Sequence, residues 1–356
     1  MENIEYLNWL KGKGLYDYAK DASIGVKRVF TQCLFVKDEQ LLIIGDRGNT
    51  NCNVAAVLSG AYFLAATQLN IGAKIVLQDV KAGTEPADQS IISSLSGIGS
   101  KNIIVLNMSD KLGGIDALGK SFRKFCKKMD HRFVSAMGLG ALGNEKIKEV
   151  VSAIDTNYKV MQDAHSIVKS AFDNAEEINI KTTAGTNLHY NVKGIKAISA
   201  DGKYAENGSG GNIPAGEVYI PPNGKRVEGM IVIDGSSRNK ESTTLIKELI
   251  RIKVEDGSIT EITGGIEAEM LRKTIEWAEG NSKNPGSVRR ICELGVGLNP
   301  NAKIIGATVV DDKSLGTAHI GIGSNYWFGG SIYANVHLDQ VFRNPEIYLD
   351  GERFNI

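Results

Sequence analysis

The stretch QLLIIGDRGNTNCNVAAVLSGAYFLAATQLNIGAKIVLQDV, from Gln40 to Val80, decides the fold of the first half of this chain. It opens with a short apolar run at 40–46, continues with apolar residues at helical spacing over 54–72, and ends with a second apolar run at 73–80. Short apolar runs between turn residues predict buried strands, so the order is strand, helix, strand. Strands joined through a helix are parallel neighbours in a sheet.

The same unit recurs, with strands predicted at 102–108 and 132–140 and a helix at 118–129. We therefore predict an α/β fold whose N-terminal domain, 1–150, is a parallel sheet with covering helices. Apolar residues three to four apart from Asn144 to Asp173 predict one long helix or two in series, and we place a bridging helix at 151–175. A chain of 356 residues is also long enough for two domains.

From residue 176 to 356 the pattern changes to short strands separated by turn residues. Asp256-Gly257 between two such strands is a strong hairpin signal, and one helix is predicted at 266–280. This half is predicted to be a strand-rich α+β domain, and it contains the residues that indicate a metal site.

Composition excludes several functions. Lys plus Arg and Asp plus Glu both number 41, so the basic excess of nucleic-acid-binding proteins is absent. The sequence shows neither a signal peptide nor an apolar run of about 18 residues, so we predict a cytoplasmic protein without membrane contact. The four cysteines are far apart and predict neither disulfides nor a cysteine-rich zinc site.

The glycines of GLGALG, residues 138–143, follow a predicted strand as they do in dinucleotide-binding units. Such a unit reaches its second strand within about 30 residues, whereas here the helical pattern continues to Asp173. We therefore predict no nicotinamide cofactor.

The segment AHIGIGSNYWFGGSIYANVHLDQ, residues 318–340, contains two of the five histidines. In a strand alternate side chains share a face, so His337 and Asp339 are expected to point the same way. His319 lies in a similar alternating run, where Gly321 and Gly323 leave its face open. Nitrogen and oxygen donors together suit divalent metals, so these side chains predict a metal site.

Two glutamates join this set. Glu293, in RRICELGVGLN, is enclosed by apolar residues and glycines, where a carboxylate without a partner is costly. Glu217, in GGNIPAGEVYIPP, follows a glycine turn and opens a predicted strand. By contrast, His165 lies on an apolar helical stripe and is predicted to be a core histidine, and His131 is predicted to be a solvated turn residue.

Four motifs, NIPAGEVYIPP, ICELGVGLNPNA, LGTAHIGIGSNY and HLDQVF, occur in this order and resemble the thermophilic-type leucyl aminopeptidases, the aminopeptidase T and aminopeptidase S group of metallopeptidases. The resemblance is weak in the N-terminal half and strong from about Asp173 onward. It implies a homodimer and a site for two divalent ions, zinc, cobalt or manganese, with the ligands Glu217, Glu293, His319, Tyr326, His337 and Asp339.

As an aminopeptidase the protein would be a hydrolase that removes N-terminal residues from peptides. Two cations would lower the pKa of a bridging water and polarise the scissile carbonyl. Glu217 or Glu293 would accept the proton of that water, and Tyr326 would bind a metal or donate to the oxyanion. This is our main prediction from the sequence.

The alternative is a relative in the same superfamily, the 2,5-dihydroxypyridine dioxygenases, which use one Fe(II) held by two histidines and an aspartate. His319, His337 and Asp339 have that composition. The chain length favours this relative, whereas retention of Glu217 and Glu293 favours the peptidase. A third reading, a binding protein that uses a metal only to join its domains, predicts a coordinatively closed ion.

Overall fold

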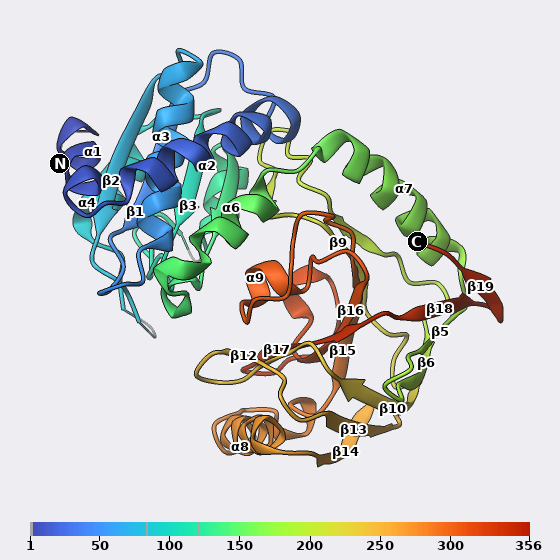
Figure 1. Cartoon of the computed structure of the whole chain (residues 1–356). Coiled ribbons are helices and arrows are strands. Elements are labelled where there is room, and N and C mark those ends of the chain that lie inside the picture. Colours follow the sequence, from blue (N-terminus) through green and yellow to red (C-terminus); the bar gives the residue numbers. More distant parts are fainter. Residues whose placement is uncertain (1–2, 83–84, 120) are drawn as a thin grey trace. The chain divides into compact units, whose positions relative to one another are not determined.

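The computed structural model describes residues 3–82, 85–119 and 121–356. Contacts divide the chain into two compact units, one formed by Met1–Gln162 with Gly202–Ala215 and the other by Asp163–Asp201 with Gly216–Ile356. The chain therefore leaves the first unit, enters the second, returns for fourteen residues and leaves again. Figure 1 shows the first unit mainly in blue to green and the second mainly in green to red.

The first unit is built on a parallel five-stranded sheet in the order β2-β1-β3-β4-β8, which confirms the predicted α/β class. The strands are β1 (Leu41–Asp46), β2 (Ala73–Gln78), β3 (Ile103–Asn107), β4 (Arg132–Ala136) and β8 (Gly210–Asn212). The first four lie where the apolar runs predict them. The fifth strand lies in the segment 202–215, and no apolar run in the sequence predicts it.

Helices cover both faces of this sheet. They are α1 (Asn3–Gly12), α2 (Tyr16–Arg28) with a π turn at Val29–Cys33, α3 (Val54–Gln68), α4 (Gln89–Gly97), α5 (Phe122–Lys128) and α6 (Ile147–Ile154), with 3-10 turns at Leu139–Ala141 and Asn144–Lys146. Helix α3 is apolar on nearly every side because it packs on β1, β2 and β3 and also under α1 and α2. On the other face, Leu42, Ile44 and Ile104 pack against Ile91 of α4 and Phe125 of α5.

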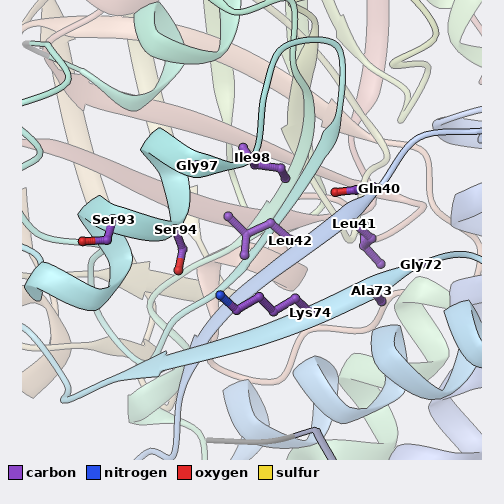
Figure 2. Close-up of a pocket in the computed structure, with 10 residues that line it drawn as sticks. All are labelled: Gln40, Leu41, Leu42, Gly72, Ala73, Lys74, Ser93, Ser94, Gly97 and Ile98. Carbon is purple, nitrogen blue, oxygen red and sulfur yellow. The ribbon is translucent and has the colours of Figure 1, made fainter.

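A cavity of about 470 Å³ lies at the amino ends of β1 and β2, beside the last turn of α4. Figure 2 shows Leu41, Leu42 and Ile98 on its walls with Lys74 and two serines. In open parallel sheets ligands bind at the carboxyl ends of the strands. This cavity is therefore at the end of the sheet where ligands do not usually bind.

The second unit begins within α7 (Tyr158–Asn174) and contains two antiparallel sheets of seven strands. The order in the first sheet is β14-β13-β10-β6-β5-β18-β19. Its strands are β5 (Glu177–Lys181), β6 (Asn187–Asn191), β10 (Val227–Ile233), β13 (Ile250–Glu255), β14 (Ser258–Thr263), β18 (Glu346–Leu349) and β19 (Glu352–Phe354). Asp256 and Gly257 both have positive φ between β13 and β14, as the hairpin signal predicts.

The order in the second sheet is β12-β11-β17-β16-β15-β9-β7. Its strands are β7 (Ile198–Ala200), β9 (Glu217–Ile220), β11 (Ser236–Arg238), β12 (Thr243–Leu245), β15 (Ile291–Gly297), β16 (Thr317–Gly323) and β17 (His337–Arg343). The remaining helices are α8 (Ile266–Gly280), which lies where it is predicted, α9 (Thr308–Asp311) and the 3-10 turns Pro285–Ser287 and Tyr326–Phe328.

The two sheets pack face to face over one apolar core. Ile180 and Leu188 of the first sheet and Val218, Leu294 and Ile320 of the second are all buried in it. Because strands alternate, the neighbours of these residues in the second sheet point to its opposite face. That face carries the predicted metal ligands.

No helix within the described ranges combines the length and the apolar character needed to cross a membrane. None of the four cysteines, all of which lie within the described residues, forms a disulfide.

Candidate metal centre

Strand register brings the predicted ligands together. On the outer face of the second sheet, Glu293 of β15 lies opposite Gly321 of β16, which in turn lies opposite Asp339 of β17. His319 of β16 is opposite Gly295, and Glu217 of β9 is opposite Gly297. His337 of β17 is opposite Gly323. Each ligand therefore faces a glycine on a neighbouring strand.

The glycines make room for the ligands. A Cβ added to Gly295 would lie 2.2 Å from Cε1 and 2.3 Å from Nε2 of His319. A Cβ on Gly321 would lie 2.9 Å from both Cβ of Glu293 and Cε1 of His337. Gly295 in ELGVG and Gly321 in HIGIG are thus steric requirements of the site, because a side chain at either position would meet a candidate ligand.

Glu293 is at the centre of the cluster. Its Oε1 is 3.1 Å from Nε2 of His319, and its Oε2 is 3.6 Å from Nε2 of His337. His319 Nε2 is also 3.6 Å from Oε2 of Glu217, and His337 Nε2 is 2.9 Å from Oδ1 of Asp339. Five side chains from four strands thus converge around one buried carboxylate.

Two groups of potential ligand atoms, each within 4.8 Å of one another, are present among the described residues. One consists of Glu217, Glu293 and His319, and the other of Glu293, His337 and Asp339. The two histidines belong to different groups, so His319, His337 and Asp339 do not form one compact triad of the kind the dioxygenase alternative needs. Glu293 takes part in both groups.

Tyr326 lies in the 3-10 turn after β16, and 55% of its surface is exposed. Its ring is 3.8 Å from the ring of Tyr333, centroid to centroid. The structure therefore shows Tyr326 paired with another tyrosine, and its role as a metal ligand stays a prediction.

Lys313 is a residue of this site that the sequence analysis missed. Only 1% of it is exposed, and its Nζ lies 2.7 Å from Oδ1 of Asp312 and 3.2 Å from Oε1 of Glu217. These two carboxylates raise the pKa of its ammonium group although burial alone would lower it. The run Asp311-Asp312-Lys313 six residues before His319 was the available signal, but charged runs are usually solvated.

Contacts at Nδ1, on the side of the ring away from Glu293 and Asp339, fix the orientation of His337. Its Nδ1 lies 2.8 Å from the carbonyl oxygen of Ser324 and 3.6 Å from Sγ of Cys292. Donation of the Nδ1 proton to that carbonyl leaves Nε2 as the atom that faces Glu293 and Asp339. Backbone carbonyls hold metal-binding histidines in this manner.

The electrostatics of the cluster favour a cation. Four buried or nearly buried carboxylates, those of Glu217, Glu293, Asp312 and Asp339, outnumber the single ammonium group of Lys313. Burial raises the pKa of Glu293 and raises the pKa of Asp312 to about 8, and a nearby cation would favour the ionised form of both. Burial lowers the pKa of His319, but its hydrogen bond to Glu293 and the charge of Glu217 raise that pKa to about 9. Burial likewise opposes ionisation of Asp339, yet His337 lowers its pKa to about 2.

A divalent metal fits this donor set. Nδ1 of His319 is a buried atom without a hydrogen bond, and Oδ1 of Asp339 is buried with Nε2 of His337 2.9 Å away. Imidazole and carboxylate donors converge from separate strands, and a divalent ion would offset most of the excess negative charge. The structure thus confirms a group of histidine and glutamate side chains able to bind metal.

The two histidines that the sequence analysis places outside the metal site give mixed results. His165 is fully buried on α7 with Nδ1 2.9 Å from Oγ of Ser199, which confirms a core histidine. The prediction for His131 is wrong, because this side chain is fully buried, contacts the ring of Phe125 and accepts a hydrogen bond from the backbone N–H of Asn102.

Comparison with known proteins separates the two enzyme classes. The family model of 2,5-dihydroxypyridine 5,6-dioxygenase matches residues 23–355. A curated 2,5-dihydroxypyridine 5,6-dioxygenase of Pseudomonas putida is 29% identical over 187 residues, which are 50% of this chain and 52% of that protein. The match thus spans about half the length of this relative.

Two solved structures share the fold. A 2,5-dihydroxypyridine dioxygenase from Pseudomonas putida has a TM-score of 0.70 and 19% identity over 93% of this chain and 94% of that one. AmpT from Thermus thermophilus has a TM-score of 0.63 and 15% identity over 95% and 97% of the two chains. At these identities the likeness shows the fold alone.

The aminopeptidase prediction is therefore wrong, together with the hydrolase and protease class that follows from it. The sequence-level matches are to dioxygenases, whereas aminopeptidase T is similar in fold only. The error has a physical cause, since glutamate, histidine and aspartate donors suit the metals of both classes. Because the family model spans residues 23–355 and thus every strand of the metal centre, this chain belongs to the 2,5-dihydroxypyridine 5,6-dioxygenase family.

Proposed function

We propose that this protein is a metal-dependent dioxygenase that opens a dihydroxylated pyridine ring of the 2,5-dihydroxypyridine type. The observation that carries the proposal is the family match over 23–355. The balanced reaction adds both atoms of O2 while the bond between ring carbons 5 and 6 breaks. Carbon 5 becomes a carboxylic acid and carbon 6 a formyl group, so no external reductant is required.

We assign one metal ion to Glu293, His337 and Asp339. Oxygen and nitrogen donors on β15 and β17, the two strands that flank β16, and a histidine fixed by the Ser324 carbonyl support this choice. Glu217 has less need of a second cation because the ammonium group of Lys313 lies 3.2 Å from it. When bound, a redox-active ion such as Fe(II) would supply the oxygen chemistry.

The second group, Glu217 with His319, is proposed to move protons. The ring hydroxyl must lose its proton when the ring opens, and a carboxylate–imidazole pair is suited to accept it. Nε2 of His319 is 3.1 Å from Oε1 of Glu293 and 3.6 Å from Oε2 of Glu217, so a proton on Nε2 holds Glu217 in place as the carboxylate that accepts the proton of the hydroxyl. This assignment gives both retained glutamates a role without hydrolysis.

Metal analysis and oxygen uptake test the proposal together. Protein loaded with Fe(II) under argon should contain close to one ion per chain and consume one O2 for each 2,5-dihydroxypyridine lost, with no hydrolysis of leucyl amides. Glu293→Gln should lose metal and activity, whereas Glu217→Gln should retain metal and lose most of kcat. Glu276→Gln, an exposed carboxylate on α8, is the matched control.

Absence of oxygen uptake from protein that carries its ion would remove the proposed function. Two ions per chain would instead reassign Glu217 and His319 to a second metal. The homodimer stays a prediction, and light scattering of the same preparation tests it.

A further inference from the structure

The connection between β16 and β17, residues 324–336, presents aromatic side chains beside the metal centre. We call it the aromatic loop. It contains Tyr326, Trp327, Phe328 and Tyr333. Trp327 is 61% exposed and Tyr333 47% exposed. Large aromatic side chains grouped at the surface frequently mark a binding site, because their exposure to water is unfavourable.

The aromatic loop is anchored at its base by Asn325, which is buried. Its Nδ2 donates to the carbonyl of Cys292 at 3.0 Å, and its Oδ1 accepts from the backbone N–H of Ile332 at 2.8 Å. Cys292 directly precedes Glu293. The aromatic side chains are thus positioned from the same strand that carries the central carboxylate, which lowers the ordering cost of binding a ligand.

Trp327 and Phe328 both contact the ring of the proposed metal ligand His337, and Trp327 lies nearer to it. Its ring centroid lies 4.6 Å from that of His337 at an interplanar angle of 69°. Phe328 lies 5.4 Å from Trp327 and 5.2 Å from Tyr219, edge to face in both contacts. The rings of Tyr326 and Tyr333 contact each other. The ring of Trp327, by contrast, has edge-to-face contacts, and most of this side chain is exposed.

We propose that Trp327, supported by Phe328, is the stacking wall against which a planar heteroaromatic substrate ring binds beside His337. The proposal rests on the proposed function and adds the residue that selects flat rings. The indole lies beside His337, so a ring bound at Glu293, His337 and Asp339 would be within reach of it. Stacking on an exposed indole is favourable for any flat π system and is lost with a saturated ring.

Binding measured without turnover tests this inference. We would titrate 2,5-dihydroxypyridine, and separately the saturated 5-hydroxypiperidin-2-one, into Fe(II)-loaded protein under argon by calorimetry. Trp327→Ala should weaken binding of the planar ring about tenfold, and Trp327→Phe should restore much of it. Trp277→Ala, which removes a 41% exposed tryptophan on α8, should have no effect. Metal content should be unchanged in all variants.

Further readouts separate stacking from a structural effect. With air admitted, Trp327→Ala should raise KM and change kcat little. A variant whose only tryptophan is Trp327 should show quenched fluorescence when the planar ring binds.

Equal affinity of wild type and Trp327→Ala for the planar ring would overturn the inference, as would equal affinity of the wild type for planar and saturated rings. The inference would also be overturned if Trp327→Ala lost a dimer while its binding of the ring was unchanged, because the aromatic loop would then be a subunit interface. A wild type that binds the ring through Trp327 without consuming O2 would support the stacking wall and remove the dioxygenase. A wild type that binds no ring would remove both.

Discussion

Lys313 and Glu293 show how single residues set the character of the site. Glu293 takes part in both ligand groups, so its position determines whether the two groups can share an ion. Lys313 provides the only ammonium group that pairs with Glu217 in the described structure. A buried charge needs a partner of opposite charge. Here the ammonium group of Lys313 pairs with the carboxylates of Glu217 and Asp312.

His165 gives a prediction about pH. Burial lowers the pKa of this histidine to about 4, whereas an unfolded histidine has a pKa near 6.5. Between pH 6.5 and 4 the unfolded state therefore holds a proton that the folded state does not, and stability falls as the pH falls. The free energy of unfolding falls by at most about 1.4 kcal/mol per pH unit from this cause.

His165→Gln removes this pH dependence of stability and retains a side chain able to form a hydrogen bond with Ser199. Urea unfolding of metal-free protein at pH 7 and at pH 5 measures the effect. The variant should lose less stability between the two pH values than the wild type. Equal losses in both proteins would show that His165 takes up its proton in the folded state.

At the scale of elements, β15 and β16 position the site through their glycines. ELGVG and HIGIG place an apolar side chain in the core at every second residue and leave the other face to a ligand or a glycine. A strand with a side chain at each position could not leave room for the imidazoles beside Glu293. The glycines weaken the strands intrinsically, and the paired β9 and β17 on either side compensate.

Gly295→Ala tests the steric requirement. The added Cβ would lie 2.2 Å from the His319 ring, so the ring must move away from Glu293. We expect a loss of about 1–3 kcal/mol in the free energy of unfolding and a large loss of activity. Urea denaturation and oxygen uptake measure the two effects.

Gly286→Ala is the matched control, because a Cβ there meets nothing within 4 Å. Its stability should change little, since replacement of an unstrained glycine also reduces the entropy of the unfolded chain. If Gly295→Ala behaved like Gly286→Ala, the imidazole would have room that the structure does not show.

At the scale of the whole molecule, the order of the chain ties the two units together. Residues 202–215 belong to the first unit although they follow the start of the second. They supply β8, whose backbone pairs with β4 from Phe133 to Ser135. The edge of the parallel sheet is thus completed by a segment that shortly precedes Glu217 of the candidate site.

This connectivity predicts that fragment 1–162 folds poorly by itself. Without β8 the edge of β4 is unpaired, which costs about 2 kcal/mol and invites association between copies. Fragment 1–162 joined to 202–215 by a flexible Gly/Ser linker should melt about 4–8 °C higher. Thermal denaturation and light scattering compare the two, and identical melting temperatures would show that β8 adds nothing to the first unit.

The sequence by itself determined the local features of this protein. Apolar periodicity predicted the four strands β1 to β4, the helix α8 and the strand-rich second half, because burial imposes a period on each element. Residue type and alternation also selected Glu217, Glu293, His319, His337 and Asp339 as candidate ligands. These predictions need only neighbours along the chain.

The tertiary structure alone decided how those residues are grouped. Pairing of β15 with β16 and β16 with β17 places Glu293 between the histidines, which are thereby divided between two ligand groups. It also buries Lys313 against Glu217 and recruits β8 from residues 210–212. Such long-range pairings depend on register between strands that are distant in sequence, and no local pattern encodes them.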